Sequence, residues 1–140
     1  MLTWKQWREK SKSSLEAAQI LLERNKPVEA ASRSYYAAYQ IVTGVLLKLD
    51  LNPRSSYGNW SNHETLEMYH THVCKKAGLG FREQQALKNL FRKFRSLLGT
   101  RYLADYGDSS GITLPSAQSL WRDANRLFGL LNSLIQRGLL

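Results

Sequence analysis

Residues 26–49 read KPVEAASRSYYAAYQIVTGVLLKL. Pro27 suits the first position of a helix, because the N–H that proline lacks would be unpaired there in any case. Apolar side chains then recur every three or four residues, at Val28, Ala31, Tyr35, Ala38, Val42, Val45 and Leu49. This spacing predicts one apolar stripe along a helix of about six turns. The stripe is widened by Tyr36, Tyr39 and Leu46, so we expect other helices to cover this one on more than one side.

The same periodicity predicts four further helices, at about residues 3–24, 62–77, 81–106 and 114–135. Two of these helices begin with a capping box, in which a hydroxyl and a side chain three residues later satisfy each other's backbone N–H groups. The pairs that form the boxes are Thr3 with Gln6 and Ser61 with Glu64. Gly78 is placed to end the third helix as a C-terminal cap.

The segments between the predicted helices are short or rich in Gly, Ser and Asn. The link at residues 24–27 leaves room only for a tight reversal, so the first two helices should run antiparallel. Residues 51–62 and 107–111 are predicted loops. No stretch alternates in the way a strand does. The sequence therefore predicts an all-α protein, a five-helix up-and-down bundle that forms a single domain over residues 1–140.

Composition limits the class of protein. The chain has 140 residues and a formal net charge of +9, which favours a polyanionic partner such as RNA, although a charge excess can also serve solubility alone. The single cysteine, Cys74, excludes an intrachain disulfide and fits a reducing compartment. The N-terminus is too polar for a secretory signal, and no apolar run approaches the roughly 20 residues needed to cross a bilayer. We therefore expect a cytoplasmic protein with no membrane contact.

The sequence offers little for a metal or a cofactor. No glycine-rich phosphate loop and no HExxH pair is present. Three histidines, His63, His70 and His72, lie close together in the sequence, but they lack a defined carboxylate spacing. Histidines on a surface or at a helix cap explain them better than a zinc site does. We predict neither a metal site nor a cofactor.

The predicted helix at residues 81–106 carries six basic residues against only Glu83 and Asp105. Several of the basic side chains project away from the apolar stripe, and Arg92, Lys93 and Arg95 are the candidates for contact with RNA phosphates. The alternative is a charged helix face that is merely solvated.

Two arginines stand apart from that face. Arg33 lies within the apolar and aromatic run at residues 30–39, where a guanidinium must reach water or a carboxylate. Arg101 and Asp105 are one helical turn apart, next to Tyr102 and Tyr106. They could form a buried structural pair, which we favour, or half of a composite site at a dimer seam.

Residues 30–39, AASRSYYAAY, resemble the R-x-x-Y-x-A signature in the second helix of HEPN domains. His63 and the segment RYLADY at residues 101–106 match two further landmarks of the small stand-alone bacterial and archaeal members. The order of these landmarks agrees over residues 3–135. The resemblance implies a five-helix bundle that pairs as a homodimer. Many members are metal-independent RNases that act as toxins or defence effectors beside a minimal nucleotidyltransferase antitoxin.

The resemblance also implies a site. In the family, an arginine is followed after four to six residues by a catalytic histidine, but after Arg101 these positions hold Tyr106, Gly107 and Asp108. The fold therefore carries over more safely than the activity, and whether the chain is an enzyme stays open. The candidate catalytic residues are Arg101, Asp105 and Tyr106. The candidate residues of an anion-binding cleft are Arg33, Tyr36 and His63.

Three functions follow as hypotheses. The first is a homodimeric toxin–antitoxin or defence protein that binds RNA, a nucleotidyltransferase partner, or both. The second is a metal-independent RNase with an altered Arg/Asp/Tyr site, and the third is a helical adaptor without a nucleic-acid role. We expect the dimer seam near the end of the helix at residues 81–106, because aromatic residues favour interfaces. We also expect Asp105 or a bound anion to lie within reach of both Arg33 and Arg101.

Overall fold

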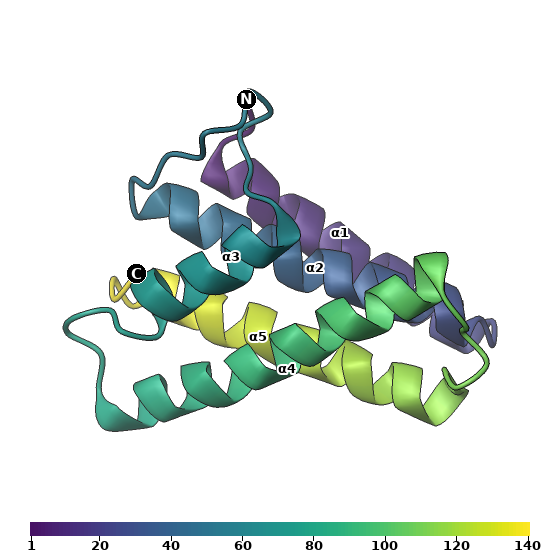
Figure 1. The fold of residues 1–140 in the computed structure, drawn as a ribbon. Coiled ribbons are helices and arrows are strands. Elements are labelled where there is room, and N and C mark those ends of the chain that lie inside the picture. Colours follow the sequence, from purple (N-terminus) through teal and green to yellow (C-terminus); the bar gives the residue numbers. More distant parts are fainter.

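The helix α2 (Pro27–Lys48) lies at the centre of the molecule, with other helices on several sides (Figure 1). It packs against α1, α3, α4 and α5, and 13 of its 22 residues are buried. Pro27 stands at its N-terminus, where no N–H is needed. The prediction that this helix is covered on more than one side is confirmed.

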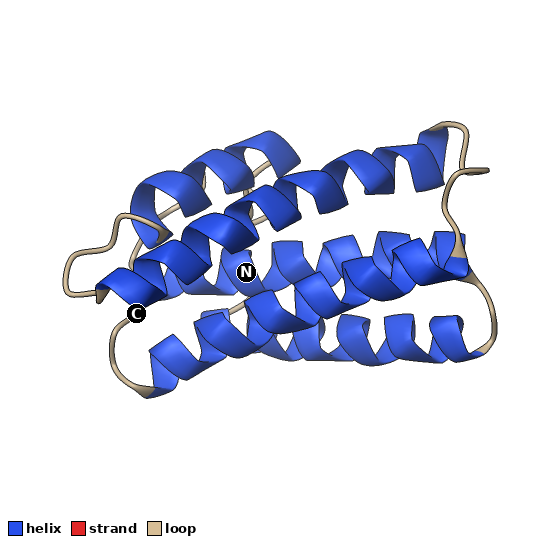
Figure 2. Ribbon diagram, turned by 90° about the horizontal axis from the view of Figure 1, so that it is seen from below, coloured by secondary structure: helices blue, strands red, loops and turns tan.

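The computed structural model describes all residues from 1 to 140 and contains no strand (Figure 2). Besides α2, its helices are α1 (Trp4–Glu23), α3 (Asn62–Met68), the π-helical turn η1 (Tyr69–Val73), α4 (Phe81–Tyr106) and α5 (Leu114–Gln136). Both predicted capping boxes are present, and Thr113 forms a third one at the start of α5. The all-α, five-helix prediction is therefore confirmed.

The third helix is shorter than predicted. After Met68 the chain forms η1, in which the N–H of Cys74 donates to the carbonyl of Tyr69, five residues earlier, at 3.0 Å. This wider turn buries Tyr69, Val73 and Cys74, whereas an uninterrupted α-helix would have turned Ala77 inward. Ala77 is exposed instead. Gly78 has a positive φ of 89°, but it lies in the turn before α4 and not at a helix end.

The helices α1 and α2 run antiparallel and approach closely. A Cβ atom at Gly44 would lie only 3.0 Å from the backbone oxygen of Trp4 and 3.3 Å from the Cβ of Trp7. Ser11, which is fully buried, donates to the carbonyl of Ala37 at 2.6 Å. Small residues on the two helices thus allow this close approach, and Asn25, with a φ of 56°, reverses the chain between them.

The core runs between α2, α4 and α5, with α3 and η1 closing one side. Its largest fully buried side chains include Tyr35, Ile41, Tyr69, Phe94 and Leu127. None of the helices combines the length and the apolar character needed to cross a membrane.

Candidate functional site at the end of α4

Arg101, in the second-last turn of α4, is the only buried arginine of the chain, with 9% of its surface exposed. Its guanidinium carbon lies 5.3 to 5.9 Å from the centres of four tyrosine rings. Two of the rings come from α2, and the other two from α4 itself. We call these four residues, Tyr35, Tyr36, Tyr102 and Tyr106, the tyrosine cage. At these distances the ring faces attract the cation.

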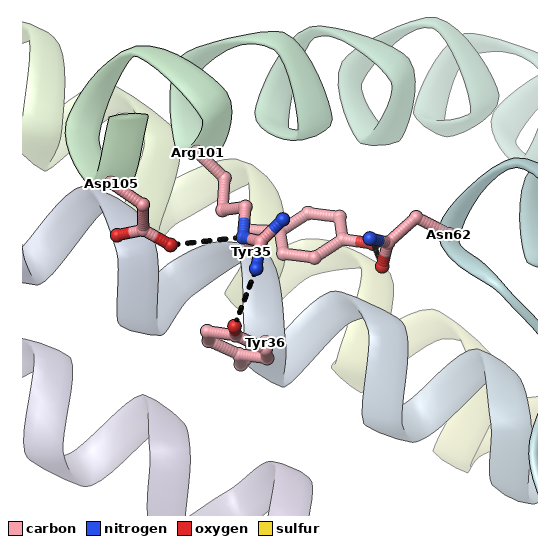
Figure 3. A network of polar contacts seen from close by, with 5 residues as sticks. All are labelled: Tyr35, Tyr36, Asn62, Arg101 and Asp105. Carbon is pink, nitrogen blue, oxygen red and sulfur yellow. Dashed lines mark hydrogen bonds and ion pairs between the residues drawn. The ribbon is translucent and has the colours of Figure 1, made fainter. Parts of the chain in front are cut away.

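Two polar groups fix the orientation of the guanidinium (Figure 3). The Nη2 of Arg101 donates to the hydroxyl of Tyr36 at 2.8 Å, and its Nε lies 3.0 Å from Oδ2 of Asp105, one turn further along α4. The remaining nitrogen, Nη1, has no partner within the chain and is not sealed off from solvent. The Nε is buried, and its contact with Asp105 is an ion pair without a hydrogen bond, so Nη1 is the nitrogen without a partner that a ligand can reach.

The surroundings of Arg101 favour its charged form. Burial alone would lower the pKa of Arg101, but the hydrogen bond to Tyr36 and the proximity of Tyr36, Asp105 and Tyr106 outweigh it, so the net pKa is raised. The cation thus persists at every pH at which the protein is folded.

Tyr35 connects the site to α3. Its hydroxyl lies 2.5 Å from Oδ1 of Asn62, the first residue of α3, to which it donates (Figure 3). Burial raises the pKa of Tyr35, with Tyr39 adding to the rise and Arg101 opposing it. Neither Tyr35 nor Asn62 was predicted from the sequence as a site residue. The only sequence feature that marks Asn62 is its position directly after the Ser61 cap.

The surface above Arg101 is exposed and apolar. The exposed fractions of Tyr102 and Tyr106 are 38% and 76%, and Leu103 between them is also exposed. Their two tyrosine rings lie 6.4 Å apart at an angle of 38°. Exposed rings beside a guanidinium can stack with unpaired bases while the cation binds a phosphate.

Comparison with known proteins identifies the family of the chain. A model of the HEPN domain matches residues 4–134. The chain belongs to the HEPN domain family. A solved structure, TT1696 from Thermus thermophilus, has the same fold, with a TM-score of 0.66 over 95% of this chain and 98% of that one. The two sequences are 18% identical. No curated protein matches.

The structure brings only some of the predicted site residues of this HEPN protein into one cluster. Arg101, Asp105, Tyr106 and Tyr36 meet, as described above. Arg33 is at the same end of the bundle, one turn before Tyr36, but it is exposed and lines a groove on the α1 side of α2. Asp105 forms an ion pair with Arg101 alone. Asp105 therefore does not serve both arginines as expected, because Arg33 faces α1 while Arg101 lies on the α4 side. The alternative, a bound anion within reach of both, stays a prediction.

The histidines take no part in the cage of this HEPN protein. His63 is exposed beside Asn62 and makes no polar contact, and His70 packs against Phe91 with ring centres 5.0 Å apart. No group of three or more His, Cys, Asp or Glu side chains is arranged to hold a metal ion.

Burial raises the pKa of Cys74 to about 11, although Tyr69 and nearby lysines act against the rise. A thiol in that state is a poor nucleophile at neutral pH.

The positions that hold the catalytic histidine in many HEPN proteins are on the surface here. Tyr106, Gly107 and Asp108 are all exposed, and Asp108 accepts from the backbone N–H of Ser110 at 2.9 Å. The three cations predicted to contact RNA, Arg92, Lys93 and Arg95, are also exposed, and none of them has a carboxylate within 4.0 Å. They are free to bind an anion.

Proposed function

We propose that this HEPN protein binds single-stranded RNA at the tyrosine cage, and that binding rather than cleavage is its main activity. One observation carries the proposal. Arg101 is held rigidly beneath exposed aromatic rings, yet its Nη1 has no partner in the chain. An arginine with a purely structural role needs no donor that is open to solvent, whereas an arginine that binds phosphate does.

The arrangement suits an unpaired strand. Tyr102 and Tyr106 offer ring faces to which any base can stack, and each stacked base contributes roughly 1–3 kcal/mol in such proteins. Arg101 is less strongly hydrated than a lysine, and its Nη1 can donate to a phosphate oxygen while Nη2 and Nε stay with Tyr36 and Asp105. The exposed cations Arg92 and Arg95 lie earlier on α4 and extend the positive charge away from the cage. The net charge of +9 fits the same partner.

In our proposal the active form is a homodimer within a toxin–antitoxin or defence-type pair. Tyr102, Leu103 and Tyr106 form an exposed apolar strip next to Arg101. Pairing of two copies through Leu103, at the edge of this strip, would bring two cages together at the rim of the seam and leave the ring faces of Tyr102 and Tyr106 open to a base. A minimal nucleotidyltransferase is the protein partner that the family resemblance suggests.

Cleavage is the second candidate, because one oxygen of Asp105 remains free. Only Oδ2 faces Arg101, so Oδ1 could accept the proton of a ribose 2′-OH while Nη1 stabilises the charge that develops on the phosphate. The 2′-oxygen would form a bond to phosphorus as the bond from phosphorus to the 5′-oxygen breaks, and the exposed hydroxyl of Tyr106 would donate the proton that the leaving 5′-oxygen needs. This site would need no metal, so a labelled RNA should be cut in the presence of EDTA and left intact by Asp105→Asn.

The binding proposal is tested with exposed residues, so that the fold stays intact. Tyr102→Ala with Tyr106→Ala should weaken binding of a fluorescent single-stranded RNA by at least tenfold in anisotropy titrations. Tyr57→Ala is the matched control, because Tyr57 is also exposed but lies on the loop between α2 and α3. Equal binding by the double variant and the wild type would refute the proposal. Light scattering of the same samples measures the dimer.

A further inference from the structure

A groove about 820 Å³ in volume runs between α4 and α5, separate from the tyrosine cage. Its apolar part is formed by Leu90 and Leu130, one from each helix, and both are partly buried. Three cations, Arg92, Lys93 and Arg126, also line the groove. All three are exposed, and no carboxylate lies within 4.0 Å of any of them. The groove thus combines an apolar surface with positive charge that is not neutralised.

A buried carboxylate also lines this groove. Asp123 has only 8% of its surface exposed, yet it forms no ion pair and accepts no side-chain or loop hydrogen bond. The carboxylate oxygens are not closed off from solvent, so they can be reached from the groove and have no side-chain partner in the chain. The cations around the groove do not come close enough to pair with it. The two oxygens of Asp123 are therefore available to N–H donors of a bound molecule.

The three features together describe the occupant. It must present N–H donors to Asp123, a flat apolar body to the two leucines and a negative charge to the cations. Guanine nucleotides do this, because N1–H and the 2-amino group form two adjacent donors that match the two oxygens of a carboxylate. Adenine places an acceptor beside its amino group, and uracil has one N–H between two carbonyls. Both would set an oxygen or nitrogen lone pair against the carboxylate.

We propose that the α4–α5 groove is a guanine subsite, in which Asp123 accepts from the base and Lys93 and Arg126 bind the phosphate. If the guanine belongs to an RNA, the inference rests on the proposed function, and guanine is the base that the protein selects from a single strand. The same chemistry would also admit a free guanine nucleotide, and the experiment separates the two sources.

The test compares three unstructured 12-residue RNAs that alternate uridine with guanosine, inosine or adenosine. Guanosine should bind roughly tenfold more tightly than adenosine. Inosine should fall between them, since it lacks only the 2-amino donor. Asp123→Asn should abolish the preference for guanosine. Asp108→Asn removes an exposed carboxylate outside the groove and should keep the preference.

A titration with guanosine monophosphate, followed by amide NMR shifts, tests the groove without RNA. Shifts at residues 89–96 and 123–130 support the proposal, and they should weaken in Lys93→Gln with Arg126→Gln even if Asp123→Asn does not fold. Shifts of this kind in a protein that binds no RNA would refute the proposed function but keep the guanine subsite.

Other results overturn the guanine subsite. Equal affinity for the three RNAs, with no response to guanosine monophosphate, would do so while leaving RNA binding intact. A change of oligomeric mass in Asp123→Asn would also do so, because it would assign the groove to a basic side chain of a second copy. Absence of both RNA and nucleotide binding would refute both proposals.

Discussion

The helices α2 and α4 are of similar length, but α2 buries 13 of its 22 residues whereas α4 buries five of its 26. The buried residues of α2 are almost all apolar or aromatic. On α4 one of the five is Arg101, and most of the remaining surface is charged or aromatic. α2 is therefore the helix on which the fold depends, and α4 is the helix that presents chemical groups to solvent.

The contrast shows how one bundle can separate stability from binding. Tyr35 and Tyr36 on α2 hold Arg101 from below, so the functional cation rests on the stable helix. The groups that would contact a ligand lie on the outer face of α4, where they can be replaced without opening the core. Substitutions in matched pairs, one on each helix, test this division.

The largest difference is expected for truncation of a leucine on each helix. Leu46→Ala removes a fully buried side chain from α2 and should lower the free energy of unfolding by about 2–5 kcal/mol. Leu103→Ala on α4 removes a half-exposed side chain and should change it by no more than about 0.5 kcal/mol. Urea unfolding followed by circular dichroism measures both. Comparable losses for the two variants would remove the basis of the comparison.

The next largest effect on stability is expected in alkaline solution and comes from the buried tyrosines. Burial raises the pKa of Tyr35 and Tyr39 on α2 and that of Tyr69 in η1. A group whose folded-state pKa is raised stabilises the fold fully below its unfolded pKa, and that contribution is lost as pH rises. Stability should thus decline above about pH 10, by about 1.4 kcal/mol per pH unit for each such tyrosine.

The alkaline effect is measured by following tyrosinate absorbance and helical circular dichroism together as pH rises. The last tyrosines should ionise only as the helices unfold. Tyr106→Phe, which alters an exposed ring on α4, should leave the unfolding midpoint unchanged. Full ionisation of all tyrosines in a protein that is still helical would contradict the burial argument.

The smallest changes in stability are expected for alanine substitutions at two glycines within helices, and the two changes should have opposite signs. Gly44→Ala on α2 forces a Cβ against the backbone of Trp4, and overpacking of this kind should destabilise by about 1–3 kcal/mol, less the gain in helix propensity. Gly99→Ala on α4 meets nothing within 4 Å and should stabilise by up to about 1 kcal/mol. Thermal unfolding shows the sign directly. A stabilising Gly44→Ala would mean that α1 can move away.

Most of the fold could be predicted because its determinants are local. Pro27 marks the start of α2, and the hydroxyls of Thr3 and Ser61 cap backbone N–H groups three residues further on. The pairing of Arg101 with Asp105 is local as well, one turn apart on a single helix. What periodicity could not reveal was η1, because a π turn depends on which side chains α4 admits and not on the sequence of α3 alone.

The parts of the site that were missed depend on how helices are rotated against one another. The position of Arg33 on the α1 side could not be predicted, since a change of less than a third of a turn would bring it to the α4 side. Asn62 meets Tyr35 only because α3 begins beside α2. Asp123 lies three residues after Leu120 and four before Leu127, so the spacing places it beside the apolar stripe of α5. That it lines a groove against α4 follows only from the packing of the two helices.

The π turn has a consequence for variation in chain length. η1 closes its hydrogen bond over one more residue than an α-helical turn does, and Thr71 within it is exposed. Deletion of that one residue would convert η1 to an α turn, and the loop residues that follow could take up the shift before α4 begins. Elsewhere in the bundle a single deletion would rotate every later side chain by about 100°. A change in chain length is therefore best tolerated at η1, next to the loop that precedes α4.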